Sequence, residues 1–387
     1  MILNRNMFFT TKFLDADPIY VKMEKAGYIK QLNSGVYAYM ELFNKLCKNV
    51  ISEISNIFSE YNIFEIKLPI LQDINLWKSS GRYDVYGSHL FSTGEKNEFV
   101  LNATNEESII DLMDKLNIKK QELPFCAYQI SERARNEIRP AYGLFRTKVF
   151  TLADCYAVVD VMDDAIFYFN IFREIFQKIS KKFNLELYEA NHLGHEHTYS
   201  IWCKSLLNQS HPIVCRKCNC SFRSKKMINK CPVCSSLEME QVVGVEIGDI
   251  AITKQLIKTK NFQDSYVVFM GLGITRLIQL LAEKKVYKDG FNWDYCYAPY
   301  KVYIASNNER EFEAQRIYEI LNGKVDIIWD NRPTSMATKL IDADLIGCPY
   351  KIIVGNNTDK NIVEIKKYNE LVKLRNDKVL QFILDNK

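Results

Sequence analysis

The sequence predicts an α+β core, an antiparallel sheet flanked by helices, with a small cysteine-containing module inserted into it and an α/β domain after it. Runs of β-branched and aromatic residues alternate with amphipathic stretches as far as residue 297. The polar stretch 203–241 breaks this alternation and holds two pairs of closely spaced cysteines. From residue 298 onward, short apolar runs alternate with helical segments, which is typical of a largely parallel sheet. We therefore assign three parts: core 1–202 and 242–297, module 203–241, last domain 298–387.

The core begins with a helical region and continues through four predicted strands. Apolar residues spaced three or four apart within 18–61 predict a helix with one buried face; they are Leu42, Leu46, Val50, Ile54 and Ile57. The predicted strands are 64–71, 98–104, 125–135 and 144–159. Helices are predicted through EESIIDLMDKL and over 163–183, where we assign the aromatic stripe to the core and not to a ligand site.

Apolar segments resume after the cysteine module. Residues 242–252 predict a strand, and residues 266–285 predict a strand, a glycine-containing turn and a helix. In the last domain the predicted strands are VYIAS, VDIIWD, YKIIVG and NIVEIKK, and the predicted helices run through EREFEAQRIYEIL and SMATKLIDADLIG.

Composition indicates an ordinary globular chain. Of its 387 residues, 47% are hydrophobic and 25% charged, and 51 basic against 47 acidic side chains give a net charge of +4. This small excess neither requires nor excludes a nucleic-acid partner, because local clustering decides that. No apolar run reaches the roughly 20 residues of a membrane span, and the N-terminus has no signal-peptide pattern. The eleven cysteines then suggest reduced thiols plus a metal site, and a cytoplasmic protein without a membrane partner.

One predicted hairpin, RARNEIRPAYGLFRTKVF, concentrates four arginines: Arg133, Arg135, Arg139 and Arg146. Guanidiniums this close repel one another unless an anion binds between them, and their planar shape suits phosphate oxygens. Glu137 could accept a hydrogen bond from an adenine amino group, and Phe150 could stack a base. The alternative is a solvated hairpin with internal arginine–glutamate pairs, and local composition weighs the two equally.

A second segment, GLGITRLIQLL (271–281), places Arg276 at the start of an apolar helix. Gly271 and Gly273 would allow a ligand to approach the backbone closely, and a helix N-terminus favours anions. The alternative is an ordinary turn between a strand and a helix, because two glycines alone are a weak signal.

The module carries two Cys-x-x-Cys pairs, CRKC and CPVC, separated by twelve residues. Such pairs place four thiolates at tetrahedral reach, as structural Zn²⁺ requires, so we expect zinc on Cys215, Cys218, Cys231 and Cys234. The alternatives are a redox pair, a metal-free relic, or ligation by Cys220 or a nearby histidine. A further hypothesis is a second metal site on His192, His195 and His197. Basic residues of the module could contact an RNA backbone or face solvent; they are Arg216, Lys217, Arg223, Lys225, Lys226 and Lys230.

Taken in order, the segments resemble the prolyl-tRNA synthetase family of class II aminoacyl-tRNA synthetases. RNE followed by GLFRTKVF resembles motif 2, GLGITR resembles motif 3, and IKLPILQDINLWKSSGRYDVYG resembles motif 1 and the stretch after it. ATNEE is similar to the family's Thr-His-Glu-Glu loop, HEH to His-Glu-Phe, and GVEIGDI to Gly-Ile-Glu-Val-Gly-His-Ile. The resemblance spans roughly residues 18 to 375 apart from the cysteine module. Related enzymes for threonine and glycine share motif 2 but match ATNEE and the C-terminal segments less well.

The resemblance implies an ATP site residue by residue. Arg135 would hold the α-phosphate of ATP and of the adenylate, and Glu137 would contact the adenine. Phe150 would stack the adenine ring against Arg276, which would also reach the γ-phosphate. Arg146 would contact the distal phosphates, and Mg²⁺ would enter with the nucleotide.

At the other end of the site, the resemblance implies that Thr104 and Glu106 bind the substrate's amino group, with His195 near the amino-acid pocket. Glu246 would help to place the ribose or the magnesium ion. No covalent protein nucleophile is needed, because the proline carboxylate attacks the α-phosphorus and the terminal hydroxyl of tRNA then attacks the mixed anhydride. The implied function is ATP-dependent activation of proline and its transfer to tRNA, by a homodimer with the motif 1 region at its interface.

The sequence departs from the family pattern mainly in the amino-acid pocket. Val268, Phe269 and Met270 replace a small–polar–tyrosine triplet, and Asn105 and Asp249 each replace a histidine. The altered triplet favours a rival hypothesis, a paralogue that adenylates another amino acid or loads a non-tRNA acceptor, while the retained C-terminal domain argues against it. A second rival is a catalytically dead RNA-binding regulator, and the retained ATP-site residues argue against it.

The C-terminal domain owes its expected anticodon-binding role to the resemblance alone. IDADLIGCPYKIIVG is similar to a segment of that domain, and Arg332 lies in a stretch similar to the family's Asp-Asp-Arg near the anticodon-reading surface. The residues themselves indicate only an α/β fold, and Lys339 and Asp344 could be surface charge. The cysteine module stands where many bacterial members carry a large editing insertion and is too short to hold one, so we expect no editing of mischarged alanine in cis.

Overall fold

The structure is a computed structural model that describes residues 1–3, 7–224, 226–261, 263–287, 289–356, 358–367 and 370–386. Its contacts divide the chain into two compact units. One unit comprises residues 34–36 and 54–280, and the other comprises residues 1–33, 37–53 and 281–387. Lys225 of the predicted basic set lies outside the described residues.

A ten-stranded sheet is the framework of the first unit, in the order β14-β12-β13-β10-β11-β15-β16-β9-β8-β4. Its strands are β4 (Phe64–Glu65), β8 (Phe125–Ala134), β9 (Val149–Val159), β10 (Tyr188–His192), β11 (Thr198–Lys204), β12 (Ile213–Cys215), β13 (Ser221–Arg223), β14 (Met239–Gln241), β15 (Gly244–Lys254) and β16 (Tyr266–Gly273). The central strands β11, β15, β16, β9 and β8 are antiparallel throughout, which confirms the predicted core.

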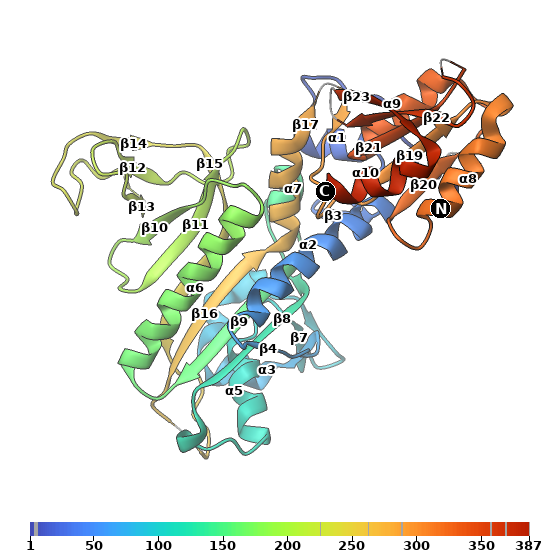
Figure 1. Ribbon diagram of the computed structural model, residues 1–387. Helices are drawn as coiled ribbons and strands as arrows, with labels where there is room; N and C mark the ends of the chain where they lie inside the picture. Colours follow the sequence, from blue (N-terminus) through green and yellow to red (C-terminus); the bar gives the residue numbers. More distant parts are fainter. Residues whose placement is uncertain are drawn as a thin grey trace. The chain divides into compact units, whose positions relative to one another are not determined.

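Helices cover both faces of this sheet. The long helix α6 (Met162–Lys182) runs along one face in Figure 1, where Phe176 packs beneath Gly248 and the predicted aromatic stripe is core. The other face carries α5 (Glu106–Lys115), whose Ile109 and Met113 pack with Tyr156 of β9. Beside α5 lies a small sheet of β5 (Leu71–Asp73), β7 (Phe99–Leu101) and β6 (Ser92–Thr93), with helices α3 (Ile74–Ser79) and α4 (Arg82–Tyr86).

Two predicted elements of the N-terminal part are wrong in extent. The predicted helix over 18–61 is broken into α1 (Ile19–Lys25), β2 (Ile29–Asn33), β3 (Val36–Tyr39) and α2 (Glu41–Ser59). Gly27 and Gly35 adopt φ of 81° and 71°, which a helix does not tolerate, although the five predicted apolar positions do form the buried face of α2. The predicted strand 64–71 survives only at its ends, since Pro69 has no N–H for a ladder.

The second unit contains a six-stranded sheet in the order β1-β20-β19-β21-β22-β23. The strands are β1 (Ile2–Leu3), β19 (Val302–Ser306), β20 (Ile327–Asp330), β21 (Tyr350–Val354), β22 (Ile362–Lys367) and β23 (Glu370–Arg375). The pairings among β1, β20, β19 and β21 are parallel, and those that add β22 and β23 are antiparallel. The predicted α/β character is therefore confirmed, and β1 is a strand that the sequence patterns did not predict.

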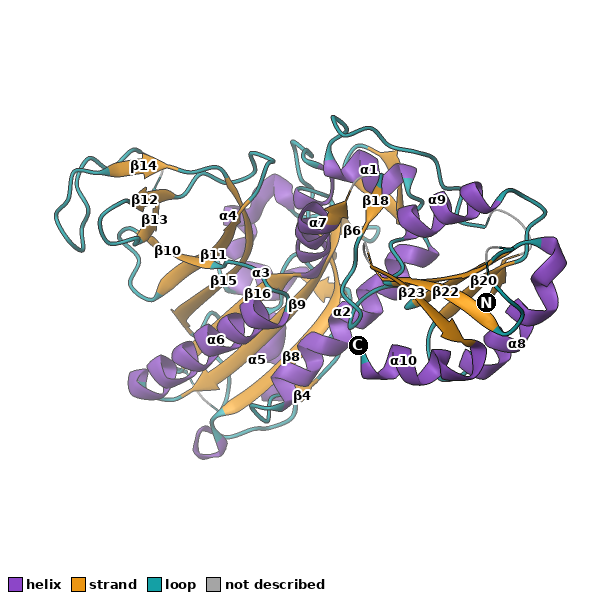
Figure 2. Ribbon diagram, turned by 45° about the horizontal axis from the view of Figure 1, so that its top comes forward, coloured by secondary structure: helices purple, strands orange, loops and turns teal. Residues whose placement is uncertain are grey.

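Three helices pack on this sheet, as Figure 2 shows: α8 (Glu311–Leu321) and α10 (Val379–Asp385) cover one face and α9 (Met336–Ile346) covers the other. The unit also contains the short hairpin of β17 (Val286–Tyr287) and β18 (Gly290–Phe291), and α7 (Ile274–Lys285) joins it to β16 of the ten-stranded sheet. Among the described residues, no helix combines the length and the apolar character that crossing a bilayer requires.

The interpretation of Lys339 as surface charge is wrong. Its side chain is buried, and its ammonium group donates to the backbone oxygens of Ser306 at 2.7 Å and Asp330 at 3.0 Å. Arg332 is likewise buried and bridges Asp330 and Asp342, at 2.7 Å from each carboxylate. These charges hold the carboxyl ends of the parallel strands together.

Candidate active site

Strand register assembles the floor of the candidate site. Asp249 on β15, Gly271 on β16, Asp154 on β9 and Gln129 on β8 are consecutive partners across the sheet. Because strand residues alternate between faces, these four lie on the face opposite α6, whose Phe176 contacts the neighbouring residue of β15. A Cβ at Gly271 would lie 2.8 Å from Asp249 Oδ1 and 3.9 Å from Asp154 Oδ1. The glycine therefore leaves room between two carboxylates.

Arg135 is the hairpin arginine whose guanidinium is held by the backbone without a carboxylate partner among the described residues. Its Nε donates to the backbone oxygen of Ala103 at 3.0 Å, and its guanidinium carbon lies 5.2 Å from the ring centroid of Phe150. Among the described residues no carboxylate forms an ion pair with it. The guanidinium is therefore oriented by the backbone while its terminal nitrogens keep their capacity for phosphate or carboxylate oxygens.

The other hairpin arginines have different surroundings. Arg146 forms an ion pair of 2.9 Å with Glu137, so the alternative of an internal pair is realised at this point. Burial alone would raise the pKa of Glu137, but the hydrogen bonds from Arg146 and from the backbone N–H of Arg139, together with the charge of Arg146, outweigh it and lower that pKa below its usual range. Arg133 does not belong to the anion-binding group, because it is fully buried and paired with Asp154. The exposed Arg139 donates its backbone N–H to Glu137 at 2.9 Å.

Arg276 stands where the sequence predicts it, in the first turn of α7. Its Nε donates to the backbone oxygen of Phe145 at 2.9 Å, and its Nη1 donates to the backbone oxygen of Glu246 at 2.8 Å. The start of α7 is also tied to the motif 2 hairpin, since Thr275 accepts from the backbone N–H of Thr151 at 2.8 Å. Two segments far apart in sequence thus form one arginine-lined end of the site.

The predicted ligands of the substrate's amino group lie together at the start of α5. The Thr104 hydroxyl donates to the carboxylate of Glu106, which also accepts from Arg82 at 3.0 Å. Burial opposes ionisation of Glu106, but Arg82 and Thr104 outweigh it and lower the pKa of the carboxyl group. The neighbouring Glu107 is also paired with Arg82, at 3.1 Å, yet burial raises its pKa.

Among the acidic residues at this end, Asp249 has a strongly shifted pKa. Burial, together with the nearby charges of Glu246, Glu106 and Asp154, raises its pKa to about 7 despite the opposing effect of Arg135. No described residue donates a hydrogen bond to its carboxylate. The sequence comparison drew attention to this position as a replaced histidine, but neither its acidic neighbours nor its perturbed pKa was predictable.

His195 stays apart from these residues. It lies in the exposed turn between β10 and β11, where its described contact is the backbone hydrogen bond to His192 at 3.0 Å. His192 in turn contacts the Ser200 hydroxyl at 2.7 Å. Among the described residues, the grouping of potential metal ligands consists of cysteines and includes none of the three histidines. The hypothesis of a second, histidine metal site therefore has no support in the geometry.

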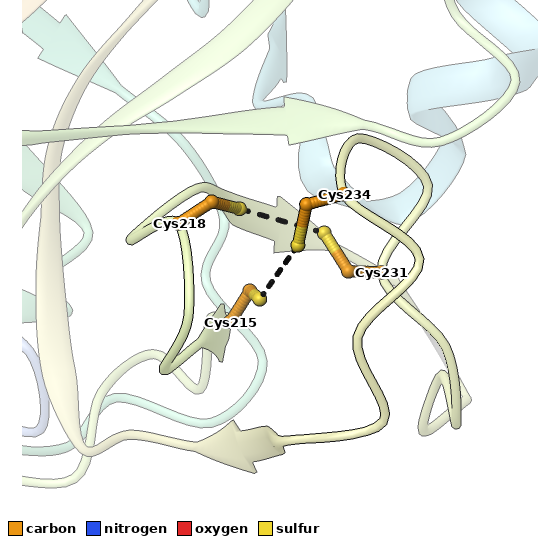
Figure 3. Close-up of side chains that lie close together, drawn as sticks. All are labelled: Cys215, Cys218, Cys231 and Cys234. Atoms are coloured by element: carbon orange, nitrogen blue, oxygen red, sulfur yellow. Dashed lines mark hydrogen bonds between the residues drawn. The ribbon is translucent and has the colours of Figure 1, made fainter.

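The four predicted cysteines do converge. Cys215, Cys218, Cys231 and Cys234 point toward one another in Figure 3, and their sulfur atoms all lie within 4.8 Å of one another. Sulfurs bound tetrahedrally at about 2.3 Å from zinc lie about 3.8 Å apart, and the observed Cys215–Cys234 and Cys218–Cys231 separations are 3.5 and 3.7 Å. A hydrogen bond from the backbone N–H of Cys218 lowers the pKa of Cys215 to about 6. The donor set therefore fits a thiolate-bound zinc ion.

Three participating residues were missed as site residues. Arg82 could have been singled out, because it ends the Leu-Trp-x-x-Ser-Gly-Arg stretch that carries part of the family resemblance. Asp154 had no such signal, and Arg223 was singled out only as one of the basic residues of the module. Asp154 becomes part of the site through strand register, and Arg223 through an ion pair with Glu246 on a distant strand.

An antiparallel sheet that carries an arginine hairpin and an arginine-bearing strand–helix turn defines the class II aminoacyl-tRNA synthetases. The family described as tRNA synthetase class II core domain (G, H, P, S and T) matches residues 89–285, and an anticodon binding domain matches residues 301–386. The chain belongs to this class II family and is an aminoacyl-tRNA ligase.

Curated relatives extend the match beyond the core. The proline--tRNA ligase of Ehrlichia chaffeensis is 28% identical, over 92% of this chain and 91% of the relative. That of Sulfurimonas denitrificans is 26% identical over 95% of both. The fold is also that of prolyl-tRNA synthetase from Cryptosporidium parvum, solved with L-proline and AMP, with a TM-score of 0.72 at 12% identity, covering 95% of this chain and 75% of that one.

Proposed function

We propose that this ligase is specific for proline: it activates proline with ATP and transfers it to tRNA. The observation that carries the proposal is that relatives named proline--tRNA ligase align with at least nine-tenths of the chain. The anticodon binding domain supports tRNA as the acceptor. The placement of Thr104, Glu106 and Arg135 around one floor supports the reaction.

The residues at the arginine-lined end fit the first step. An oxygen of the proline carboxylate attacks the α-phosphorus of ATP, the bond from that phosphorus to the bridging oxygen breaks, and pyrophosphate leaves. Arg135 would hold the α-phosphate, and Arg276 and Arg146 would hold the distal phosphates, so the enzyme acts by position and charge. Phe150, whose ring already lies against Arg135, would stack the adenine, with Glu137 near its amino group.

The residues at the acidic end fit the amino group. Thr104 and Glu106 would bind the proline ammonium, and the floor between Asp154 and Asp249 would lie beneath the ring. In the second step, the terminal hydroxyl of tRNA attacks the carbonyl carbon of the adenylate and AMP leaves. His195 remains a candidate for the pocket edge only through the family resemblance.

The altered triplet bears on specificity less than its sequence suggests. Phe269 shares a face with Gly271, whereas Val268 and Met270 point to the face of α6, since strand residues alternate. Met270 is 1% exposed and belongs to the core, while Phe269 packs beside the apolar cluster of α5. Of the three side chains, Phe269 alone would border the proposed amino-acid pocket, and a phenyl ring there is compatible with an apolar pyrrolidine.

Two metal ions accompany the proposal. Mg²⁺ would enter with ATP, held by phosphate oxygens and by one carboxylate, for which Glu246 is the candidate. Zinc would bind the four thiolates of the module and cross-link its two Cys-x-x-Cys turns, with no open position for catalysis. Both assignments rest on the chemistry of the donor groups.

The proposed assembly is a cytoplasmic homodimer that uses the motif 1 region. Phe64, Ile70 and Leu71 in this region are each 47% exposed, an apolar set that a partner surface would cover. β4 is an edge strand of the ten-stranded sheet, so it could also extend its pairing.

The test is amino-acid-dependent exchange of pyrophosphate into ATP, run with each of the twenty amino acids. We expect exchange with proline alone, followed by charging of tRNA that carries a proline anticodon. Exchange with a different amino acid would favour the hypothesis that the protein is a paralogue that activates that amino acid. Absence of exchange with all twenty would favour the inactive RNA-binding regulator.

A further inference from the structure

The cysteine module is continuous with the catalytic sheet. Its strand β13 pairs in parallel with β10, with Ala190 opposite Ser221 and His192 opposite Arg223. The module's β12 and β14 continue the sheet outward from β13. A displacement of β13 would therefore be passed through β10 to β11, the strand that pairs with β15.

Glu246 is the point where the module meets the arginine-lined end. On β15, Gly248 is opposite Ile201 and Glu246 is opposite Trp202, so β15 carries one extra residue, a β-bulge at Ile247. A β-bulge changes the direction in which nearby side chains point. Glu246 lies next to this bulge, and its backbone is held by side chains on both sides. Its backbone N–H donates to Gln209 Oε1 at 2.9 Å, and its backbone oxygen accepts from Arg276 at 2.8 Å.

The third contact to Glu246 comes from Arg223. On β13, Phe222 is buried among Cys215 and Cys231, and because strand residues alternate, Arg223 projects to the opposite face. Its Nη1 forms an ion pair with the Glu246 carboxylate and donates to the Ser200 hydroxyl at 3.0 Å. Gln209 and Arg223, both from the inserted module, thus hold the backbone and the side chain of one residue.

The cysteines determine where β13 lies. Cys215 ends β12, and its backbone N–H donates to the backbone oxygen of Cys220 at 2.9 Å, which closes the turn between β12 and β13. Cys218 lies inside this turn, and Arg223 follows five residues later. A metal ion on the four thiolates would anchor the turn to the second cysteine pair and so fix the strand that carries Arg223.

We propose that the cysteine module is a positioning device for ATP, in which Arg223 and Gln209 hold Glu246 and, through its backbone, Arg276. This inference deepens the proposed function and rests on it for the identity of the nucleotide. Arg223 is a positioning residue: it also neutralises a carboxylate that would otherwise repel the triphosphate. The second carboxylate oxygen of Glu246 would be able to hold a magnesium ion that accompanies ATP.

The first test is Arg223→Gln, with ATP and proline titrated separately in pyrophosphate exchange. Because half-exposed ion pairs contribute modestly, we expect the KM for ATP to rise by about threefold to tenfold. The KM for proline should change by less than about twofold, since Arg82 and Thr104 hold the other end. Arg223→Lys should recover most of the ATP affinity. Arg216→Gln is the matched control, because Arg216 lies in the same module and pairs with Glu240, away from the site.

An unchanged KM for ATP in Arg223→Gln would overturn the proposal, and so would an equal loss in the Arg216→Gln control. Gln209→Ala gives an independent test, because it removes the contact to the Glu246 backbone without touching the module's charge or thiols. Gln209→Ala should also weaken ATP binding, as Arg223→Gln does. Calorimetric titration of ATP measures the effect even if the proposed function fails and no amino acid supports exchange.

The role of the metal ion is tested on the full-length protein, with zinc content and the thermal midpoint of unfolding recorded before and after chelation. We expect metal removal to raise the ATP dissociation constant of the wild-type protein as Arg223→Gln does, and to add little in that variant. Metal removal that weakens both proteins equally would show that zinc acts independently of Arg223 and would refute the coupling. If the metal-free protein unfolds, Gln209→Ala still tests the proposal, because that experiment does not require metal removal.

Discussion

The two ends of the active site are built on opposite principles. At the ATP end, Arg135 and Arg276 are oriented by backbone carbonyl oxygens, at 3.0 Å and at 2.9 and 2.8 Å. Carbonyls fix a guanidinium without cancelling its charge, so the positive charge remains for a phosphate. At the amino-acid end, Glu106 is paired with Arg82, and Asp249 lies near further acidic residues, with no described residue donating a hydrogen bond to its carboxylate.

Under the proposed function, this contrast would let the site bind a zwitterionic substrate next to a polyanion. The positive end would attract phosphates and the attacking carboxylate, and the acidic end would attract the ammonium group. An amino acid placed between them would be oriented by charge before any specific contact forms. Changes at the positive end should therefore affect the chemical step and ATP, while changes at the acidic end should affect the amino acid and its pH dependence.

The largest effect is expected from Arg135→Ala. Loss of the guanidinium that would hold the α-phosphate removes charge stabilisation from the transition state, so proline-dependent exchange should fall about a thousandfold or more. The thermal midpoint should change little, because Arg135 makes one described hydrogen bond and no ion pair. Arg139→Ala is the control on the same hairpin and should keep near-normal exchange, since Arg139 is exposed and contributes its backbone N–H. Equal losses in both variants would break the assignment of Arg135.

Asp249→Asn should produce the next largest effect, and it depends on pH. The Asp249 carboxyl group has a pKa of about 7 in the folded protein, against about 3.9 in an unfolded chain. The folded state holds the Asp249 proton more tightly than the unfolded state does. The free energy of unfolding therefore falls as pH rises from about 4 to about 7, and this loss of stability persists at higher pH. Asp249→Asn removes the penalty and should stabilise the protein by on the order of 1–3 kcal/mol at pH 8, with little difference near pH 4.

The same substitution separates a catalytic cause from a structural one. In the wild-type protein, protonation of Asp249 weakens the acidic end, so the KM for proline should rise as pH falls through about 7. Asp249→Asn should have a higher KM for proline at pH 8 and should lose this inflection, while the KM for ATP stays the same. Denaturant unfolding at several pH values and separate substrate titrations measure both. A pH profile identical to that of wild type would contradict the role of Asp249.

Most of the residues proposed for the ATP end could be grouped from the sequence because they are close in sequence. Arg135, Glu137, Arg146 and Phe150 lie within one hairpin, so their proximity follows from a single turn. The cysteine cluster was predictable for the same reason, since two short turns need only meet. Arg133 was misassigned because alternation along β8 directs it toward the buried Asp154, a contact that depends on the register with β9.

The acidic end could not be predicted to the same depth. Asp154 becomes a neighbour of Gly271 and Asp249 because β9 pairs with β16, a strand far from it in sequence, and one-residue shifts would turn each side chain to the other face. The bulge at Ile247 that displaces Glu246 is likewise a property of the pairing. The broken N-terminal helix differs: the sequence contains Gly27 and Gly35, but apolar spacing on either side concealed the hairpin.

The smallest effect is expected from Phe150→Leu, which tests whether the positive end also recognises the base. The ring lies 5.2 Å from the Arg135 guanidinium carbon, a cation–π contact worth about 0.5–1 kcal/mol where partly exposed. Leucine keeps an apolar surface but loses the π face, so the KM for ATP should rise about twofold to fivefold, and the KM for proline should not change. Pyrophosphate exchange with ATP and with a nucleotide that carries a smaller base distinguishes stacking from a general loss of order at Arg135. If Phe150→Leu weakens the binding of proline more than the binding of ATP, the division of the site into two independent ends is wrong.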